Sequence, residues 1–442
     1  MGDGIAEHDP GEWLAGVAAA GARALASAEG ARIAVVGVAA LGPAPVLVDD
    51  ELRPLTPALL FALDRRAEPQ RLDMVERGSS EGPDATLDSA LPKLAWWLEH
   101  DPETAAGARW ALDATGFVVG SLTGVAVMDS ITAADYALPG VEAPVPLPDP
   151  LDATAVAGGL EPGWAERLGL PAGVPVTAGT YDSFADLAAA GVRRPGDSGL
   201  VLGSTTIVCR AVDHGFEPPA GLGLSAYPGE GVVAGGWTLS GGLVLDWFAE
   251  RFAAHDDVAR AAAEREPGGL LALPYVSGER TPLWDPFARG AVIGLSLESG
   301  PAEVHRALVD SLALTALDHA ERLEPALGRC GTWGATGGGT RHPLWAQATA
   351  DALGARLEIA PDAGDAVGPA LLGLRAIGAE PERRPAAVLE PDPRRAERYR
   401  ELLPAFRELA TAVAPIMRTL KGSDPHPGGR VRPSPGGEER VS

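Results

Sequence analysis

An aspartate at a predicted strand-to-helix turn is the first residue that could do chemistry. Residues 174–178 are predicted to form a strand, and Gly179-Thr180-Tyr181-Asp182 leads from it into a helix that begins at Ser183. Ligands of α/β proteins bind at the carboxyl edge of the sheet, where such turns lie. Asp182 could therefore accept a proton from a bound hydroxyl group. The alternative is that it only caps the helix.

Two turns rich in glycine could hold an anion or a nucleotide. Gly203, Ser204 and Thr205 form the predicted turn of a hairpin between strands 200–202 and 207–209. Small residues let the backbone approach a phosphate, and the hydroxyls add donors. The second turn lies between a predicted strand, 331–336, and a predicted helix, and it could accommodate a flat ring or a ribose; its residues are Gly337, Gly338 and Gly339. Each turn could equally be an ordinary tight connection between elements.

Alternating strands and helices must position these turns, and that alternation predicts an α/β architecture. Asp9 and Pro10 are typical of a helix start, as the cap and the first helical residue. Helices are expected over residues 10–28, 105–122, 302–323 and 395–414. The last of these is expected to end before Pro415, because proline lacks the N–H that a helix interior needs.

The length of the chain and a candidate boundary segment near its middle predict two domains. A chain of 442 residues is too long for one core. We expect the boundary near Arg193, which gives an N-terminal domain over 1–193 and a C-terminal domain over 194–420. Residues 421–442 are rich in proline, glycine and charge, a composition typical of disorder.

Composition limits the partners and the compartment. The formal net charge of −24 disfavours a nucleic-acid partner, although local backbone N–H groups can still bind a small anion. The two cysteines cannot form a disulfide framework, and the N-terminus lacks the basic and apolar regions of a signal peptide, so a cytoplasmic protein is expected. No apolar run approaches the length of a membrane span, and no metal-ligand spacing occurs among the eight histidines.

Several stretches, in order, resemble the FGGY carbohydrate kinases, and in particular the xylulose kinase-like members. The most specific match is Leu273–Leu314, which contains Gly-Glu-Arg-Thr-Pro and the long helix after it. Others are the Asp182 region with the hairpin that follows it, and the strand–turn–helix that carries the three glycines. Shorter matches are Glu7–Trp13, Leu59–Ala67 and Ser121–Gly124. The resemblance covers about residues 7 to 415.

This resemblance implies a fold and a reaction. The fold is two ribonuclease-H-like domains of the actin and hexokinase type around a nucleotide cleft. The reaction is the transfer of a phosphoryl group from ATP, with Mg²⁺, to a sugar or polyol hydroxyl, with Asp182 as the base. The implied binding residues are Asp64, Arg66 and Asp182 for the substrate, and Gly203, Ser204, Thr205, Gly241, Gly242, Gly337, Gly338 and Gly339 for the nucleotide. Related kinases often form dimers, so a homodimer is one possible assembly.

Two departures from the family pattern leave a second hypothesis open. Members begin with a hairpin that carries an Asp-x-Gly-Thr motif, which contacts phosphates and helps to organise the metal. No such motif precedes Glu7, so we expect an incomplete N-terminal domain. The substrate loop of the xylulose kinase-like members is polar, whereas Val38–Pro43 is apolar here. The chain is then either an active kinase or a catalytically inactive relative, which would be a binding or regulatory protein or the product of a decaying gene.

Overall fold

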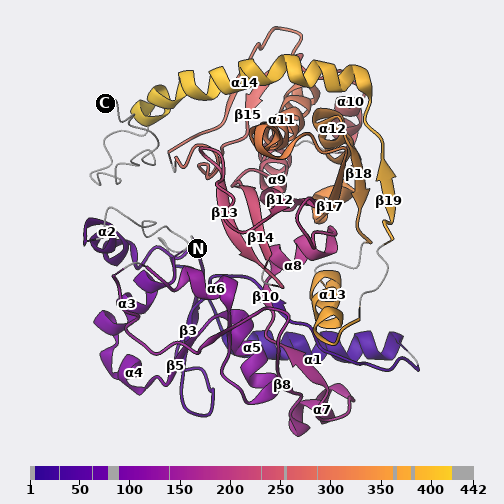
Figure 1. Cartoon of the computed structure of the whole chain (residues 1–442). Coiled ribbons are helices and arrows are strands. Elements are labelled where there is room, and N and C mark those ends of the chain that lie inside the picture. The colour runs from indigo at the N-terminus through magenta and orange to yellow at the C-terminus, as the bar shows by residue number, and fades with distance from the viewer. Residues whose placement is uncertain are drawn as a thin grey trace, which may run out of the picture. The chain divides into compact units, whose positions relative to one another are not determined.

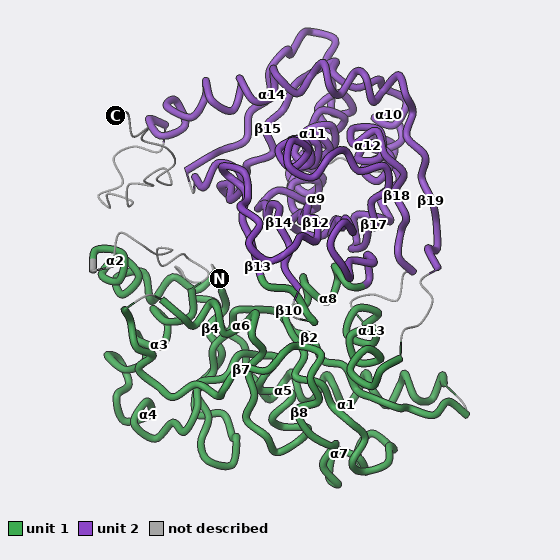
Figure 2. Tube along the Cα trace, viewed as in Figure 1, with its two compact units in different colours: residues 1–188, 226–230, 365–382 green, residues 189–225, 231–364, 383–442 purple. Residues whose placement is uncertain are grey.

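The structure is a computed structural model that describes residues 5–28, 30–61, 63–77, 89–138, 140–229, 231–252, 256–285, 287–361, 366–379 and 384–420. The chain forms two compact units, coloured green and purple in Figure 2. Unit 1 comprises residues 1–188, 226–230 and 365–382, and unit 2 comprises 189–225, 231–364 and 383–442. The predicted tail, 421–442, lies outside the described residues. The boundary between domains at 193 stays a prediction.

Unit 2 is built on a mixed sheet of seven strands, in the order β13-β14-β12-β11-β17-β18-β19. β12 is antiparallel to both of its neighbours, whereas β11, β17 and β18 run parallel. The strands of the sheet are β11 (Ser198–Leu202), β12 (Thr206–Val212), β13 (Gly223–Tyr227), β14 (Gly231–Trp237), β17 (Thr332–Thr336), β18 (Arg356–Ile359) and β19 (Ala387–Leu389). A separate antiparallel pair is formed by β15 (Leu271–Leu273) and β16 (Ala291–Ile293).

Helices bury the apolar side of this sheet (Figure 1). Alanines of α11 and α12 pack with Leu200, Val208 and Leu357 of three different strands. A second core joins α9, α11, α12 and α14 around Trp345 and Tyr399, which are fully buried. The helices of unit 2 are α9 (Gly242–Phe252), α10 (Asp256–Ala263), α11 (Pro301–Leu327), α12 (Pro343–Leu353) and α14 (Pro393–Leu420), and a 3₁₀ turn, η1, spans Gly338–Arg341.

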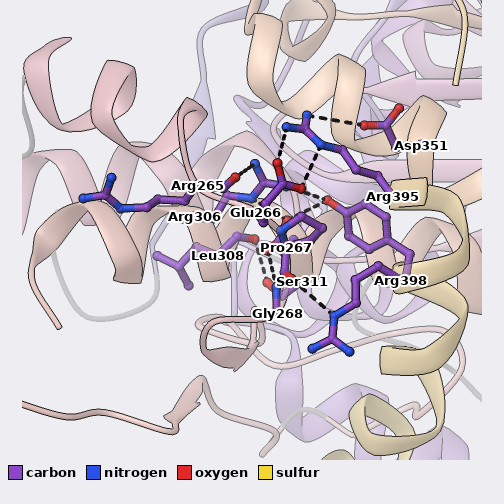
Figure 3. A network of polar contacts seen from close by, with 12 residues as sticks. Arg265, Glu266, Pro267, Gly268, Arg306, Leu308, Ser311, Asp351, Arg395 and Arg398 are labelled. Atoms are coloured by element: carbon purple, nitrogen blue, oxygen red, sulfur yellow. Dashed lines mark hydrogen bonds and ion pairs between the residues drawn. The ribbon is translucent and has the colours of Figure 1, made fainter. Parts of the chain in front are cut away.

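A buried ion pair within α11 binds the Tyr399 hydroxyl of α14, and Figure 3 shows the polar network around Arg306. The guanidinium of Arg306 donates to Asp310 Oδ1 at 2.8 Å, to Tyr399 Oη at 3.2 Å and to the carbonyl of Arg265 at 2.7 Å. Tyr399 in turn donates to Asp310 Oδ1 at 2.6 Å. Both charged side chains are 4% exposed, so each depends on the other for compensation of its charge. At the surface, Arg395 pairs with Glu266 at 3.1 Å.

Unit 1 contains short strands that, among its described residues, pair only in twos. These pairs are β1 (Glu7–His8) with β4 (Ala58–Leu59), β2 (Ala39–Ala40) with β10 (Thr180–Tyr181), β3 (Val46–Val48) with β5 (Trp110–Leu112), β6 (Met128–Asp129) with β7 (Pro150–Leu151), and β8 (Val156–Gly159) with β9 (Pro175–Thr177). The helices are α1 (Pro10–Ser27), α2 (Glu68–Arg77), α3 (Leu91–His100), α4 (Pro102–Gly107), α5 (Ala114–Thr123), α6 (Ser130–Asp135), α7 (Pro162–Leu168), α8 (Asp182–Ala189) and α13 (Val367–Ala376).

Two helix predictions need correction. The predicted helix over 105–122 is interrupted by β5, because Trp110–Leu112 pairs antiparallel with Val48–Val46 and its alanine and leucine are buried. Tertiary pairing overrides helix propensity in this segment. The last helix does not end before Pro415 but runs to Leu420. The start of α1 is confirmed, since Asp9 Oδ1 accepts the N–H of Gly11 at 2.8 Å.

Helix α13 packs within unit 1, although the sequence places it in the expected C-terminal domain. The packing depends on glycines: a Cβ on Gly37 would lie 1.9 Å from the carbonyl oxygen of Pro369, and one on Gly368 would lie 2.1 Å from that of Ala185. The backbone of α13 therefore approaches both the segment before β2 and helix α8. Sequence distance alone did not indicate this return of the chain.

Candidate active site

Asp182 begins helix α8, directly after strand β10. The sequence predicted a strand-to-helix transition here, but it placed Thr180 and Tyr181 in the turn rather than in a strand. The side chain of Asp182 is exposed, and its Oδ1 accepts the N–H of Ser183 at 2.6 Å. The two residues before it, Thr180 and Tyr181, are buried, and Thr180 makes one hydrogen bond with its side chain and one with its carbonyl. Its Oγ1 donates to Asp129 at 3.1 Å, and its carbonyl accepts from Thr115 at 3.0 Å. The exposed Asp182 therefore directly follows a buried strand whose Thr180 is fixed by two hydrogen bonds.

The predicted substrate loop, Val38–Pro43, runs beside this strand. Ala39 and Ala40 pair in parallel register with Thr180 and Tyr181. Gly179 allows the close approach: its φ is +73°, and a Cβ there would lie 2.4 Å from the carbonyl oxygen of Val38. The structure thus brings the loop and Asp182 together within unit 1. The loop contributes backbone groups and apolar side chains to this place.

Asp113 binds the backbone directly after the substrate loop. Its Oδ2 accepts the N–H of Ala44 at 2.8 Å and the hydroxyl of Tyr136 at 3.0 Å. The carboxyl is 1% exposed, and its burial raises the pKa to about 7 from an ordinary 3.8. Sequence reasoning missed this residue because it lay within a predicted helix. An aspartate three residues before the stretch Gly116–Val119 was the available signal.

Asp64 and Arg66, the predicted substrate residues, form an ion pair with each other. Asp64 is buried and accepts the N–H of Ala6 at 2.9 Å, and it pairs with Arg66 at 2.8 Å. Arg66 also pairs with Glu7 at 2.6 Å and lies 5.0 Å from the ring centre of Trp96. These contacts hold the segment around β1, and no contact joins either residue to Asp182 among the described residues. Their role in substrate binding stays a prediction.

The predicted nucleotide residues of unit 2 come together in space. The N–H of Gly242 donates to the carbonyl of Gly203 at 2.8 Å, so the turn after β14 meets the turn between β11 and β12. A Cβ on Gly241 would lie 2.6 Å from the carbonyl oxygen of Ser204. A Cβ on Gly337 would lie 2.6 Å from that of Leu202, beside the same turn. Three backbone turns distant in sequence therefore form one cluster, and Ser204 is exposed on it.

The glycines of this cluster serve different purposes. Gly241, Gly337 and Gly339 are needed for packing, because a Cβ on any of them would collide with backbone or, for Gly339, with the ring of Trp345 at 2.2 Å. Around Gly338, the nearest atom to an added Cβ is Nη2 of Arg341 at 3.3 Å. Gly338 is therefore the glycine of this turn whose missing side chain is not explained by packing. Its predicted place beside the nucleotide stays a prediction.

Glu279 accepts hydrogen bonds from the turn after β14, and it was not among the predicted site residues. Its carboxylate accepts the N–H of Leu239 and the hydroxyl of Ser240, each at 2.6 Å, and the N–H of Arg280 at 2.8 Å. It is 2% exposed, and its burial raises the pKa to about 7 in spite of these donors. The Gly-Glu-Arg-Thr-Pro segment contains this residue, so the signal was present in the sequence.

We expect alanine at Gly338 and at Gly339 to have opposite consequences. Gly338→Ala should keep the melting temperature but weaken MgATP binding about tenfold or more, because the new methyl group would stand against the nucleotide. Gly339→Ala should cost about 1–3 kcal/mol of stability through the clash with Trp345. Calorimetric titration and thermal unfolding measure both effects. Unchanged ATP affinity in a folded Gly338→Ala protein would contradict this assignment.

The raised pKa of Asp113 predicts a loss of stability with rising pH. Its folded pKa, about 7, exceeds the unfolded value, so the folded chain binds the extra proton between about pH 4 and 7. The stabilisation is present below that interval and is lost as the pH rises through 7, by up to about 4 kcal/mol. Urea unfolding between pH 5 and 8 should show this fall for the wild type and a smaller one for Asp113→Asn. Parallel curves for the two proteins would refute the assignment.

The described residues contain no group of three histidine, cysteine, aspartate or glutamate side chains arranged to hold a metal ion. In the same part of the chain, no helix has the length and apolarity to cross a bilayer.

Comparison with known proteins identifies the class of molecule. Residues 194–377 match the C-terminal domain of the FGGY family of carbohydrate kinases. Over these residues the chain is similar to the FGGY carbohydrate kinases. A xylulose kinase from Escherichia coli (strain K12) is 28% identical over an alignment 458 residues long. The alignment covers 93% of this chain and 91% of that protein. One from Bacillus subtilis (strain 168) is 26% identical over 412 residues, covering 85% and 82%.

Solved structures agree with the FGGY assignment. The xylulose kinase from Rhodospirillum rubrum superimposes with a TM-score of 0.79 at 28% identity, over 94% of this chain and 92% of that one. This chain therefore has the predicted α/β fold of the actin and hexokinase type. Its homologues are sugar kinases.

Proposed function

We propose that this FGGY protein transfers the γ-phosphoryl group of MgATP to a hydroxyl of a small sugar or polyol. The observation that carries the proposal is the exposed carboxylate of Asp182, at the end of β10 and beside the substrate loop. The homology to sugar kinases supports the reaction class. Magnesium enters bound to ATP, whose charge it neutralises.

Asp182 acts as the general base in this proposal. The proton of the sugar O–H passes to the Asp182 carboxylate as the oxygen attacks the γ-phosphorus, and the bond from that phosphorus to the bridging oxygen of ADP breaks. In such reactions positioning and charge neutralisation supply most of the catalysis. The turns at Gly203–Thr205 and Gly241–Gly242 contact phosphates, and Gly338 lies against the adenosine.

A coupled assay of ADP release over pentuloses, polyols and aldonates tests the proposal. We expect one class to give turnover that depends on both ATP and Mg²⁺. The apolar loop should make selection among sugars shallow, because a site without hydrogen-bonding side chains discriminates hydroxyl patterns by about 100-fold at most. The absence of turnover with every compound, in a preparation that is folded by thermal unfolding, would overturn the proposal.

A catalytically inactive relative is the second candidate, and the composition of the substrate loop favours it. Val38–Pro43 contains no side chain that can hydrogen-bond to a sugar. Such a protein would serve as a binding or regulatory partner. The same assay separates the two, because the inactive form would show no sugar-dependent ADP release.

A further inference from the structure

Asp113 stands at the N-cap position of α5, yet it does not cap the helix. Its side chain makes no hydrogen bond to the N–H groups of the first turn. Asp129, at the same position of α6, behaves as an ordinary cap and accepts the N–H groups of Ile131 and Thr132 at 3.1 and 3.2 Å. Aspartate is favoured at such positions because it caps. Capping therefore does not explain Asp113.

The Asp113 carboxylate is directed to the substrate loop instead. Ala44, whose N–H it accepts, directly follows that loop, and Tyr136 adds a second donor to the same oxygen. The other oxygen, Oδ1, has no hydrogen-bond partner among the described residues. Burying a carboxyl group that is only partly compensated costs stability. A role in stability therefore accounts poorly for this arrangement, whereas a role in placing the loop accounts for it.

Gly42 lies between Asp113 and the residue that precedes the proposed base, Asp182. A Cβ on Gly42 would lie 2.0 Å from Cε1 of Tyr181 and 3.0 Å from Oδ1 of Asp113. The loop backbone is thus packed between the Asp113 carboxyl and the Tyr181 ring, and Tyr181 directly precedes Asp182. Phe61 supports the same loop from the other side by donating its N–H to the carbonyl of Pro43 at 2.9 Å.

We propose that Asp113 is a positioning residue for the phosphoryl acceptor, holding the substrate loop in register with the strand that ends at Asp182. The inference rests on the proposed kinase function and names what aligns the acceptor within it. Because Val38–Pro43 lacks polar side chains, the loop can offer a sugar only its backbone N–H and C=O groups. Backbone groups can align the sugar only if the loop itself is held in place. A small displacement of the reacting groups lowers the reaction rate by a large factor.

Steady-state kinetics of Asp113→Ala and Asp113→Asn test this role. Asp113→Ala should raise the KM for the sugar at least tenfold and leave the KM for ATP within twofold of wild type. Asp113→Asn should stay within about threefold for both. Its amide oxygen, in the place of Oδ2, can still accept both the Ala44 N–H and the Tyr136 hydroxyl, and the Tyr136 hydroxyl also lies 3.4 Å from the carbonyl of Leu112 as an alternative acceptor.

Leu94→Ala is the matched control for lost stability. Leu94 is fully buried in unit 1 on α3, and it belongs to a different apolar cluster from the loop. The Leu94→Ala substitution should lower the melting temperature and leave the KM for the sugar and the KM for ATP unchanged. The proposal is overturned if Asp113→Ala keeps the wild-type KM for the sugar, or if it raises the KM for ATP as much as that for the sugar.

Hydrogen–deuterium exchange separates this proposal from the proposed function. Even if no sugar is phosphorylated, amides of residues 38–44 should exchange at least tenfold faster in Asp113→Ala than in the wild type, with Asp113→Asn close to the wild type. Peptides from unit 2 should exchange alike in all three proteins. Equal exchange of residues 38–44 in the wild type and in Asp113→Ala would overturn the proposal, whether or not the protein is active.

Discussion

Replacement of Asp182 by asparagine should lower kcat by about 10²- to 10⁴-fold, the range typical for the loss of a general base. Asparagine has nearly the same shape and can still accept the N–H of Ser183, but it cannot take the proton of a sugar hydroxyl. We therefore expect the KM for ATP to change little and the melting temperature to stay the same. Initial rates of ADP release at saturating sugar and MgATP measure the effect.

Asp50→Asn is the control for this substitution. Asp50 is an exposed aspartate of unit 1 whose carboxylate lies 3.6 Å from Nε of Arg109. Its replacement should leave kcat unchanged. If Asp182→Asn keeps more than about a tenth of the wild-type kcat, Asp182 is not the base.

Replacement of Arg306 by methionine should destabilise unit 2 by about 3–5 kcal/mol, the cost of leaving one member of a buried ion pair without its partner. Methionine fills part of the volume but cannot donate to Asp310, to Tyr399 or to the carbonyl of Arg265. Burial already raises the pKa of Asp310, so the loss of Arg306 should raise it further. The midpoint of urea unfolding at pH 7.5, followed by the fluorescence of unit 2 tryptophans, measures the change.

Arg356→Met is the matched arginine substitution on the surface of unit 2. Arg356 is 44% exposed and lies 3.6 Å from Glu358, so its loss should cost less than about 1 kcal/mol. At pH 5 the destabilisation by Arg306→Met should shrink, because Asp310 can then take up a proton. Equal effects of the two substitutions would show that the Arg306–Asp310 ion pair does not stabilise the unit.

The sequence predicted the parts of the site that depend on local patterns. Asp182 followed from a strand–turn–helix pattern, and the glycine turns followed from their flanking strands. That Gly242 would meet Gly203 could not be derived locally, because this contact depends on the order of strands in the seven-stranded sheet. The FGGY resemblance, rather than the pattern of residues, supplied the grouping of these turns.

Asp113 shows why the rest could not be predicted. Residues 105–122 have the composition of a helix, and β5 forms only because residues 46–48 offer a strand to pair with. Once that strand is missed, the aspartate at its end looks like the interior of a helix. The return of α13 to unit 1 was missed for a similar reason, since glycine contacts at Gly37 and Gly368 permit it without any periodic signal.

Direct observation of phosphoryl transfer tests the central claim most closely. ³¹P NMR of the full chain with MgATP and the best sugar of the panel should show a sugar phosphate and ADP accumulating in equal amounts. The same spectra with Asp182→Asn should show neither above the background. ADP together with inorganic phosphate and no phosphorylated sugar, or equal transfer by the wild type and Asp182→Asn, would contradict a sugar kinase whose base is Asp182.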